Sequence, residues 1–585
     1  MRQAHIGFYE TGEEITAGES AVSPSLITEN GPFELEAQTK LGTAQREEQS
    51  DERNENEHPS KWRLAMIMIA LCSSVFCMAL DNTIIATAIP RITDQFQALD
   101  DVGWYGAAYL LTTSSLQLTF GKLYAFYSVK RVYLTALFIF ELGSFVCGIT
   151  PNSTGLLLGR AVAGMGAAGI FSGAILIISQ TVPLHQRPAY MGLVVSMYGI
   201  ASVAGPLLGG AFTDHVTWRW CFYINLPLGL VTTVFIITFF RTAGKNTKNT
   251  MTLQQKLCMM DLEGTAFFVP GIACLLMALQ WGGTTYPWRS GRIIALFIVF
   301  GVLITSFLLI QRWKQEKATV PPRVFKNRNV WGSALFGAFS GAGFFVMVYY
   351  VCHILAAEQI DSKLTVLQTP IWFQSIKGVS AVKSGIMNLP LILSLVIMSI
   401  VSGVTVSIVG YYTPFMLLSS ILMIVGAGMM STFEVNSNAA QWIGYQVLFG
   451  FGVGCGMQQT IVAVQASLPY ADIPVGAAVM MFSQTLGGAL GISVAQNVFQ
   501  NQLVSNFAAS QLSGLDPKTV IQAGATQIQT LIPHKFLPVV LTAYNQALTH
   551  TFYVSVAVTS LSFFSTLCIE WKSVRGVDIK IAAGA

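Results

Sequence analysis

The sequence predicts an all-α membrane protein with 14 transmembrane helices, and two observations support that prediction. Of the 585 residues, 53% are hydrophobic and only 11% carry a charge, whereas soluble globular domains have about 25% charged residues. The mean hydropathy is +0.56. Fourteen apolar runs of about twenty residues follow one another along the chain. Each must be a helix, because a backbone in lipid has to satisfy its own hydrogen bonds.

The segment before the first apolar run, residues 1–60, is acidic and lacks apolar periodicity. It holds 13 of the 29 acidic residues and only four basic ones, which is typical of a disordered, solvated tail. It contains no short apolar core followed by a small-residue cleavage site. We therefore expect no cleaved signal peptide, and we expect the first span to direct its own insertion.

The predicted spans follow the apolar runs in order. They cover residues 62–88, 104–124, 132–150, 154–182, 189–212, 219–240, 262–281, 292–311, 330–350, 384–408, 412–432, 441–467, 475–500 and 547–570. An even number of spans places both termini on one side of the membrane. The loops on that side, with the flanks of the first and last spans, hold 19 basic residues against nine in the opposite loops. Both termini, including the tail at residues 572–585, are therefore predicted to be cytoplasmic.

The two halves of the chain share a weak sequence repeat. The fourth span contains GRAVAGMGAAG from Gly159, and the twelfth contains GFGVGCGMQQ from Gly450. Parallel repeats of this kind favour two six-helix bundles, at residues 61–242 and 329–571. The seventh and eighth spans would then be an inserted pair within a linker at residues 243–328.

Four motifs resemble signatures of the major facilitator superfamily. They are LDNTIIATAIP at Leu80 to Pro90, GRAVAGMGAAG at Gly159 to Gly169, AGPLLGG at Ala204 to Gly210 and WRWCFYINLP at Trp218 to Pro227. With fourteen spans, the chain resembles the drug:proton antiporter branch of that family, in the style of fungal toxin efflux pumps, over residues 60–570. The resemblance implies the major facilitator fold, in which two six-helix bundles face each other across a central cavity.

The loop after the second span departs from the family pattern. Members usually read Gly-x-Leu-x-Asp-x-x-Gly-Arg-Arg, but this chain reads GKLYAFYSVKR, with Ala125 in place of the acid and Ser128 in place of the second glycine. The charge relay that the resemblance implies for that aspartate cannot work in the same way here. Lys130 and Arg131 remain, either as contacts to helix C-termini or anionic headgroups, or as ordinary cytoplasmic anchors.

Three charged residues lie well inside apolar runs, where a charge costs about 2.5 to 3.5 kcal/mol. They are Asp81, Glu141 and Arg160, in the first, third and fourth spans. The resemblance implies that Arg160 takes part in proton coupling by interacting with a titrating carboxylate. Asp81 is the first candidate for that carboxylate, and Glu141 is the second. The alternative for each acid is a fixed structural partner that never changes its protonation.

The fifth span carries GIASVAGPLLGG, which concentrates glycines and a proline inside an apolar run. Ala201, Gly205 and Gly209 lie four residues apart, so they form one helix face that lets another helix approach closely. Pro206 lacks an N–H and bends the helix. The resemblance implies that this antiporter motif, which also includes Gly210, seals the interface between the bundles. Generic small-residue packing is the plainer alternative.

The predicted cavity is apolar and adaptable. The chain has 37 phenylalanines, 18 tyrosines, 11 tryptophans and 21 methionines, and such surfaces accept varied apolar ligands. Four glutamines at membrane depth are candidate cavity liners, with hydrogen bonding between helices an equal alternative: Gln117, Gln458, Gln459 and Gln484. In WRWCFYINLP, the aromatic rings are expected at the outer membrane interface, and Asn225 and Pro227 indicate a helix bend and a helix contact.

Three features belong to the predicted non-cytoplasmic side. Asn152 begins the glycosylation sequon Asn-Ser-Thr, but it lies almost on the membrane, so we expect it to be unused. The loop at residues 501–546 contains TQIQTLIP, a candidate surface helix. The segment at residues 351–368 interrupts a connection that is nearly direct in the resembling fungal proteins. Its codons can contain a 5′ splice site, a branch point and a 3′ splice site, so we hypothesise a retained intron, with a lineage-specific loop as the alternative.

These observations predict a proton-coupled exporter of small amphipathic molecules, such as a fungal secondary metabolite, a toxin or drugs. It would work as a monomer by rocking of the two bundles. The alternatives are a nutrient or siderophore transporter on the same scaffold, and a non-transporting membrane sensor. An enzyme is not expected, because the seven histidines are scattered. ATP hydrolysis is not expected to drive transport, because no GxxxxGKS or GxxxxGKT phosphate loop occurs.

The expected partners are a small-molecule substrate, protons and the lipid bilayer. We expect no metal, no cofactor and no nucleic acid, and the proton gradient is the expected energy source. The nine cysteines form neither a ligand-spaced cluster nor a disulfide framework. The plasma membrane is the expected location, with the vacuolar membrane as the alternative.

Overall fold

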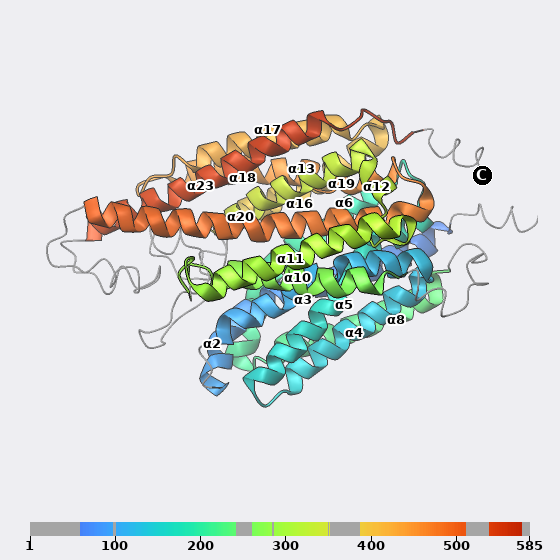
Figure 1. The fold of residues 1–585 in the computed structure, drawn as a ribbon, viewed down its shortest axis with the longest axis horizontal. Helices are drawn as coiled ribbons and strands as arrows, with labels where there is room; N and C mark the ends of the chain where they lie inside the picture. The colour runs from blue at the N-terminus through green and yellow to red at the C-terminus, as the bar shows by residue number, and fades with distance from the viewer. Residues whose placement is uncertain are drawn as a thin grey trace, which may run out of the picture. The chain divides into compact units, whose positions relative to one another are not determined.

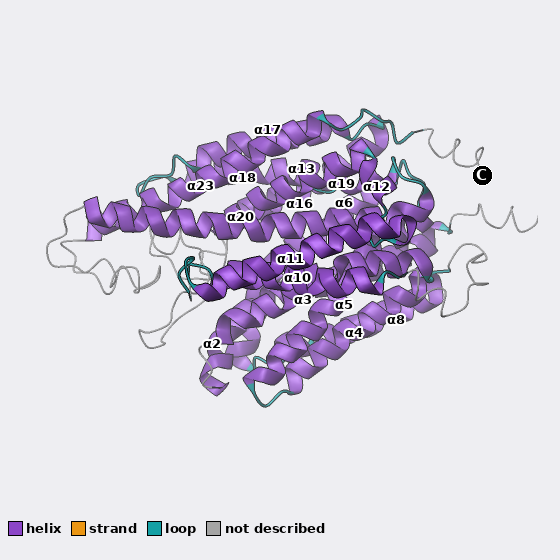
Figure 2. Ribbon diagram, viewed as in Figure 1, coloured by secondary structure: helices purple, strands orange, loops and turns teal. Residues whose placement is uncertain are grey.

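The computed structural model describes residues 59–96, 101–241, 260–283, 286–348, 350, 387–509 and 537–575. The acidic tail up to residue 58, the insert at 351–368 and the TQIQTLIP segment lie outside these residues, so the predictions made for them stay predictions. The described part is helical, and its extended pairing is limited to two isolated bridges (Figure 2).

Three groups of helices follow one another along the described chain (Figure 1). The first group is α2 (Lys61–Phe96), α3 (Val102–Phe126), α4 (Val129–Ile149), α5 (Ser153–Thr181), α6 (Arg187–His215), α7 (Trp220–Tyr223) and α8 (Asn225–Phe239). The second is α10 (Leu262–Trp281), α11 (Gly291–Lys314) and α12 (Pro322–Lys326). The third is α13 (Arg328–Met347), α16 (Leu389–Val409), α17 (Thr413–Met430), α18 (Ala439–Gly456), α19 (Gln459–Gln465), α20 (Ile473–Ala509) and α23 (Leu537–Leu567).

Thirteen helical stretches of the described part are long and apolar enough to cross a membrane. They correspond to every predicted span except the second, which is α3. This helix has 25 residues, and about 20 suffice to cross, but its middle carries four consecutive hydroxyl residues at 112–115 and Gln117. Thr113 and Gln117 hydrogen-bond to α5. The polar face of α3 is therefore covered by protein, which makes it a span that hydropathy alone understates.

The predicted loop at residues 501–546 is wrong at both ends. The helix α20 continues to Ala509, and α23 already begins at Leu537. The two extensions pack on each other: Leu503, Phe507, Val540 and Tyr544 share one buried cluster, and Asn506 donates to the Ala543 carbonyl at 2.9 Å. Both helices extend beyond the apolar runs of the sequence because the two extensions pack on each other and stabilise each other.

The helix partners of the first group recur in the third group. α2 packs against α6 and α8, and α13 packs against α20 and α23. Likewise α5 lies against α3 and α4, and α18 lies against α16 and α17. This correspondence is what a parallel repeat produces. The domain boundaries at residues 242, 328 and 571 stay predictions.

The two halves meet through glycines near one end of their helices. In the contact between α6 and α16, Gly192 lies against the Ser399 carbonyl, with no room for a side chain. Gly403 lies equally close to the Pro188 carbonyl, and Gly121 of α3 packs directly on α20. These contacts lie towards the starts of α6 and α20 and the ends of α3 and α16. These contacts between the halves therefore lie at the end that the basic loops assign to the cytoplasm, and Gly199 continues them along α6 against Val396 and Ile392 of α16.

The inserted pair lies between the halves, since α10 contacts both α3 and α20 (Figure 1). The pair is fixed by Asp261, which caps α10 and is wholly buried. Its carboxylate accepts from Gln311 Nε2 at 2.6 Å, from the Thr319 N–H at 2.9 Å and from Lys314 Nζ at 3.0 Å. Burial alone would raise the pKa of Asp261, but these donors outweigh it and hold the pKa below its usual value.

Candidate functional site

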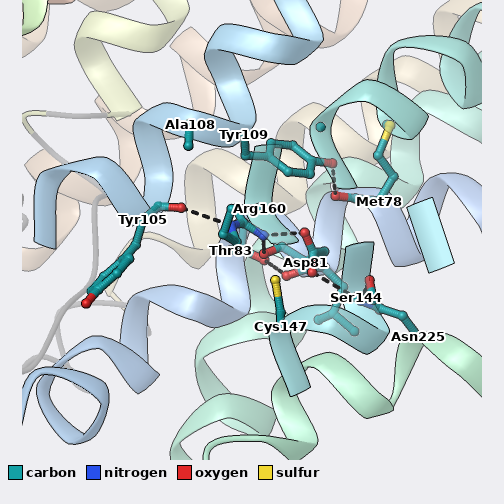
Figure 3. Close-up of polar contacts among 12 residues, drawn as sticks. Met78, Asp81, Thr83, Tyr105, Ala108, Tyr109, Ser144, Cys147, Arg160 and Asn225 are labelled. Carbon is teal, nitrogen blue, oxygen red and sulfur yellow. Dashed lines mark hydrogen bonds and ion pairs between the residues drawn. The ribbon is translucent and has the colours of Figure 1, made fainter. Parts of the chain in front are cut away.

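An ion pair lies in the interior of the first helix group. Asp81 of α2 and Arg160 of α5 are both wholly buried, and Arg160 Nη1 bonds to Asp81 Oδ2 (Figure 3). Arg160 Nε donates to the Tyr105 carbonyl of α3 at 2.9 Å. Its guanidinium also lies over the Tyr109 ring, 4.5 Å from the centroid. Two of the three predicted proton-coupling residues are thus in direct contact.

Small residues of α5 bring neighbouring backbones close to Arg160. A side chain at Gly159 would overlap Cys147 of α4, and one at Gly164 would overlap the backbone of α3. One at Gly166 would overlap the backbone of α4. The GRAVAGMGAAG motif therefore permits close helix contact, and this contact encloses the guanidinium group on all sides.

Asn225 is a further hydrogen-bond partner of Asp81, and it was not predicted as a site residue. It is the first residue of α8, and its Nδ2 donates to Asp81 Oδ1 at 3.1 Å and to Ser144 Oγ of α4 at 3.2 Å (Figure 3). The sequence feature that could have indicated Asn225 as a site residue was a polar side chain at the start of an apolar span. Sequence alone could not show that it faces Asp81.

The stretch before Asn225 differs from its predicted placement. Trp218 was expected at the membrane interface, but it is buried, and its Nε1 donates to Gln95 Oε1 of α2 at 2.8 Å. Arg219 donates to the Thr150 carbonyl at 3.0 Å. Trp220 is exposed, as an interfacial ring would be. The segment therefore ties the start of α8 to the outer ends of α2 and α4.

Glu141, the third predicted proton-coupling residue, lies apart from the ion pair. Both of its carboxylate oxygens are buried and accept no hydrogen bond from the described residues. A side chain at Gly229 of α8 would overlap this carboxyl group. Gly229 follows Asn225 by four residues, and Ser144 follows Glu141 by three. The Gly229–Glu141 and Asn225–Ser144 contacts between α8 and α4 therefore lie one helical turn apart. The neutral acid fits this site, since an ionised carboxylate there would be unpaired.

The thin face of the antiporter motif is present, and its partner is α2. Ala201 is wholly buried, and side chains at Gly205 and Gly209 would overlap Thr83 and Thr87. Thr83 Oγ1 also donates to the Ala201 carbonyl at 3.0 Å. The face therefore packs inside its own bundle.

Other residues of α6 make the contact with α16 of the second half. Gly192 and Gly199 face α16, whereas a methyl group at Gly210 would meet no described atom of another segment within 4 Å. Pro206 lies inside α6, which continues through it. The contact with the other half is thus made by Gly192 and Gly199, because the thin face of Ala201, Gly205 and Gly209 is already occupied by α2.

The candidate cavity liners are engaged in bonds between helices, which was the alternative prediction. Three of the four glutamines bind groups on neighbouring helices or on the break between α18 and α19. Gln117 Nε2 donates to Ser172 Oγ at 2.5 Å, Gln458 Nε2 to the Ser399 carbonyl at 2.7 Å, and Gln484 Nε2 to the Met457 carbonyl at 3.1 Å. Gln459 is wholly buried, and its side-chain atoms have no partner among the described residues.

Two polar residues near the membrane surfaces have local partners. Lys130 Nζ donates to the Ile237 and Phe240 carbonyls at 2.8 and 2.7 Å, so it contacts the C-terminus of α8. Asn152 Oδ1 accepts from the Gly155 N–H at 2.8 Å and caps α5. Capping keeps Asn152 close to the helix end, and the unused sequon stays a prediction.

Comparison with known proteins gives matches over most of the chain. The family model of the Major Facilitator Superfamily matches residues 71–492. The MFS-type transporter astH of Aspergillus oryzae is 56% identical over 526 residues, which cover 90% of this chain and 90% of that protein. The MFS-type efflux pump MFS1 of Trichophyton rubrum is 52% identical over 95% of this chain and 100% of that protein.

A solved structure matches the fold as well. The proton:xylose symporter XylE has a TM-score of 0.55 at 12% identity, covering 89% of this chain and 100% of that chain. At this identity the similarity concerns the arrangement of helices alone.

Proposed function

Because the chain belongs to the major facilitator superfamily, we propose that it is an efflux antiporter that exchanges protons for small amphipathic molecules. Two similar proteins are named a transporter and an efflux pump, and both come from fungi. A fungal secondary metabolite or toxin is therefore the proposed substrate class, and drugs of similar polarity are secondary candidates. The protein is further proposed to work as a monomer in the plasma membrane, with both termini in the cytoplasm.

The pair of Asp81 and Arg160 supports proton coupling more than any other observation. Both side chains are wholly buried, so their attraction is weakly screened. When a proton binds Asp81, the carboxyl group loses its charge. Arg160 then keeps its contacts to Tyr105 and Tyr109 of α3. Proton binding would thus weaken the link between α2 and α5, and Glu141 is the proposed second proton site.

The proton gradient supplies enough free energy for export without a cofactor. A membrane potential of 100 mV contributes about 2.3 kcal/mol per proton, and one pH unit contributes about 1.4 kcal/mol. Together they support a substrate gradient of several hundred-fold, roughly, for one proton per molecule.

The contacts between the bundles fit one state of a rocking cycle. Gly121, Gly192 and Gly403 join the halves at the predicted cytoplasmic end. In the proposed cycle this is the state that faces outward, and it would bind protons from the outside. Export requires these glycine contacts to separate so that substrate can enter from the cytoplasm.

The test begins with metabolites extracted from cells with and without the gene. Loss of the gene should raise the retained amount of at least one small amphipathic compound. That compound is then loaded into vesicles containing the purified protein, and the outside is made acidic. Faster loss of the compound supports antiport, whereas accumulation inside the vesicles would show symport and overturn the direction of transport.

A further inference from the structure

Asn225 uses only half of its hydrogen-bonding capacity in the described arrangement. Its Nδ2 hydrogens go to Asp81 Oδ1 at 3.1 Å and to Ser144 Oγ at 3.2 Å. Its Oδ1 is buried and accepts nothing from the described residues. A buried amide oxygen without a donor is uncommon in proteins and calls for a reason.

The surroundings of Asp81 restrict where a proton can bind. Asp81 Oδ2 faces Arg160 Nη1, and arginine can only donate. A proton must therefore sit on Oδ1, which faces Asn225. The acid O–H and the amide N–H would then be two donors in contact. Half a turn of the carboxamide removes this conflict, because it presents Asn225 Oδ1 as an acceptor.

Ser144 can serve both orientations of the amide. Its hydroxyl accepts from Asn225 Nδ2 in the described arrangement, and a hydroxyl can equally donate to the amide oxygen after the turn. The bond between α4 and α8 is therefore kept in both states. Each orientation matches one protonation state of Asp81.

We infer that Asn225 is a positioning residue that registers the proton on Asp81, donating to the carboxylate and accepting from the carboxylic acid. This inference rests on the proposed function, in which Asp81 binds the coupling proton. Asn225 lies directly after the short helix α7, and Trp218 and Arg219 anchor that segment to α2 and to the turn after α4. The amide is thus placed where α2, α4 and α8 meet.

Several other titratable groups surround Asp81, and any test must separate them. They are Cys77 on the same helix, Tyr109 on α3, Glu141 and Cys147 on α4, Arg160 on α5 and Cys221 on α7, and Tyr198 of α6 interacts in turn with Tyr109. Glu141 is the nearest alternative carboxyl site for the proton, because it touches Gly229 one turn after Asn225.

Infrared difference spectra between alkaline and acidic pH test the inference without any substrate. The protein is labelled with asparagine that carries carbon-13 in the side-chain carbonyl, and is reconstituted in lipid. We expect an isotope-sensitive amide band that shifts as the Asp81 acid band appears. The band shift should vanish in Asp81→Asn and Asn225→Leu. It should persist in Glu141→Gln and in Thr232→Val, which removes another buried bond of α8.

The variants also carry a quantitative expectation. In Asn225→Leu the ionised form of Asp81 loses a charge-assisted hydrogen-bond donor, and its protonated form loses an acceptor of a weaker hydrogen bond. The ionised form is therefore destabilised more. The pH at which the acid band is half formed should therefore rise by about one unit, a tenfold change in proton affinity. Ser144→Ala should move it less.

The outcomes separate the inference from the proposed function. If Asp81→Asn removes no acid band, Asp81 does not titrate, and the proton-coupling proposal fails. If Asp81 titrates but no labelled amide band responds in the unmodified protein, the inference about Asn225 is overturned while the proposed function stands. The second result needs no variant, so it does not depend on how well any variant folds.

Discussion

The two halves of the molecule pack alike but bury different chemistry. The first half encloses Asp81, Arg160 and Glu141 between its helices. In the described α-helices of the second half, from α13 to α23, Arg328 at the start of α13 is the one Asp, Glu, Lys or Arg residue, and Asp472 lies in the short 3-10 helix before α20. At the repeated glycine motif, Arg160 after Gly159 is matched by a phenylalanine after Gly450.

The second half uses neutral polar groups at comparable places. Gln458 bonds to α16, and Gln484 bonds to the Met457 carbonyl that the break between α18 and α19 exposes. These bonds do not change with pH. Helix packing is therefore shared between the halves, whereas in the described spans the two buried acids and the buried arginine all lie in the first half.

Replacement of Arg160 by alanine should have the largest effect on this difference. It leaves Asp81 buried without its counter-charge, and loss of one partner of such a pair costs about 3 to 5 kcal/mol. Efflux of the identified compound should be abolished. Phe451→Leu, at the matching position of the second half, should keep more than half of the activity.

A control separates lost coupling from lost protein. The double variant Asp81→Asn with Arg160→Gln removes both charges and so leaves no unpaired buried charge. Its abundance in the membrane should therefore be higher than that of Arg160→Ala, while efflux stays absent. Normal efflux in Arg160→Ala, or an equal loss in Phe451→Leu, would contradict the assignment of proton chemistry to the first half.

The single variant Asp81→Asn should have the next largest effect. Asparagine keeps the volume and an acceptor for Arg160, but it cannot bind a proton. The substrate gradient that a pH difference supports should fall at least about tenfold, while exchange of labelled for unlabelled compound continues. Gln458→Leu should change the rate but not the response to pH. A wild-type response in Asp81→Asn would move the coupling site elsewhere.

Gly229→Ala should have a smaller effect, on stability. Its methyl group would overlap the Glu141 carboxyl group, and overpacking of this kind costs about 1 to 3 kcal/mol. Gly428→Ala in α17 is the matched control, because the added methyl group would meet no described atom of another segment within 4 Å. Thermal unfolding in detergent measures both. Restoration of stability by Glu141→Ala in the Gly229→Ala background would confirm the contact, and equal stability of the two glycine variants would refute it.

The smallest expected effect belongs to the inserted pair and is confined to acidic pH. The pKa of Asp261 is below its usual value because bonds from Thr319, Gln311 and Lys314 outweigh the effect of burial. Its stabilising contribution is therefore complete above about pH 4 and is lost as the pH falls through the lower, folded pKa. The unfolding temperature of Asp261→Asn should depend less on pH in that range than that of the unmodified protein. An identical acid dependence would exclude Asp261 as its source.

Hydropathy located the helices well where lipid sets their length. The seventh predicted span, residues 262–281, coincides with α10, and the fourth differs from α5 by one residue at each end. Prediction failed at α20 and α23, which extend beyond the predicted spans, where Phe507 and Tyr544 belong to one buried cluster. Such a contact joins distant segments and leaves no trace in local composition.

The sequence by itself determined which residues are chemically unusual: two acids and one arginine in apolar runs, a thin glycine face, and glutamines at membrane depth. Their rarity in lipid follows from the solvation free energy of charged and polar side chains, which residue type and position within the apolar run determine. Only the tertiary structure decided the partners. Asp81 and Asn225 are separated by 144 positions in the chain, and the thin face of α6 meets α2 instead of α16. A helix offers several faces to several neighbours, so the choice among them is made by packing of the whole bundle.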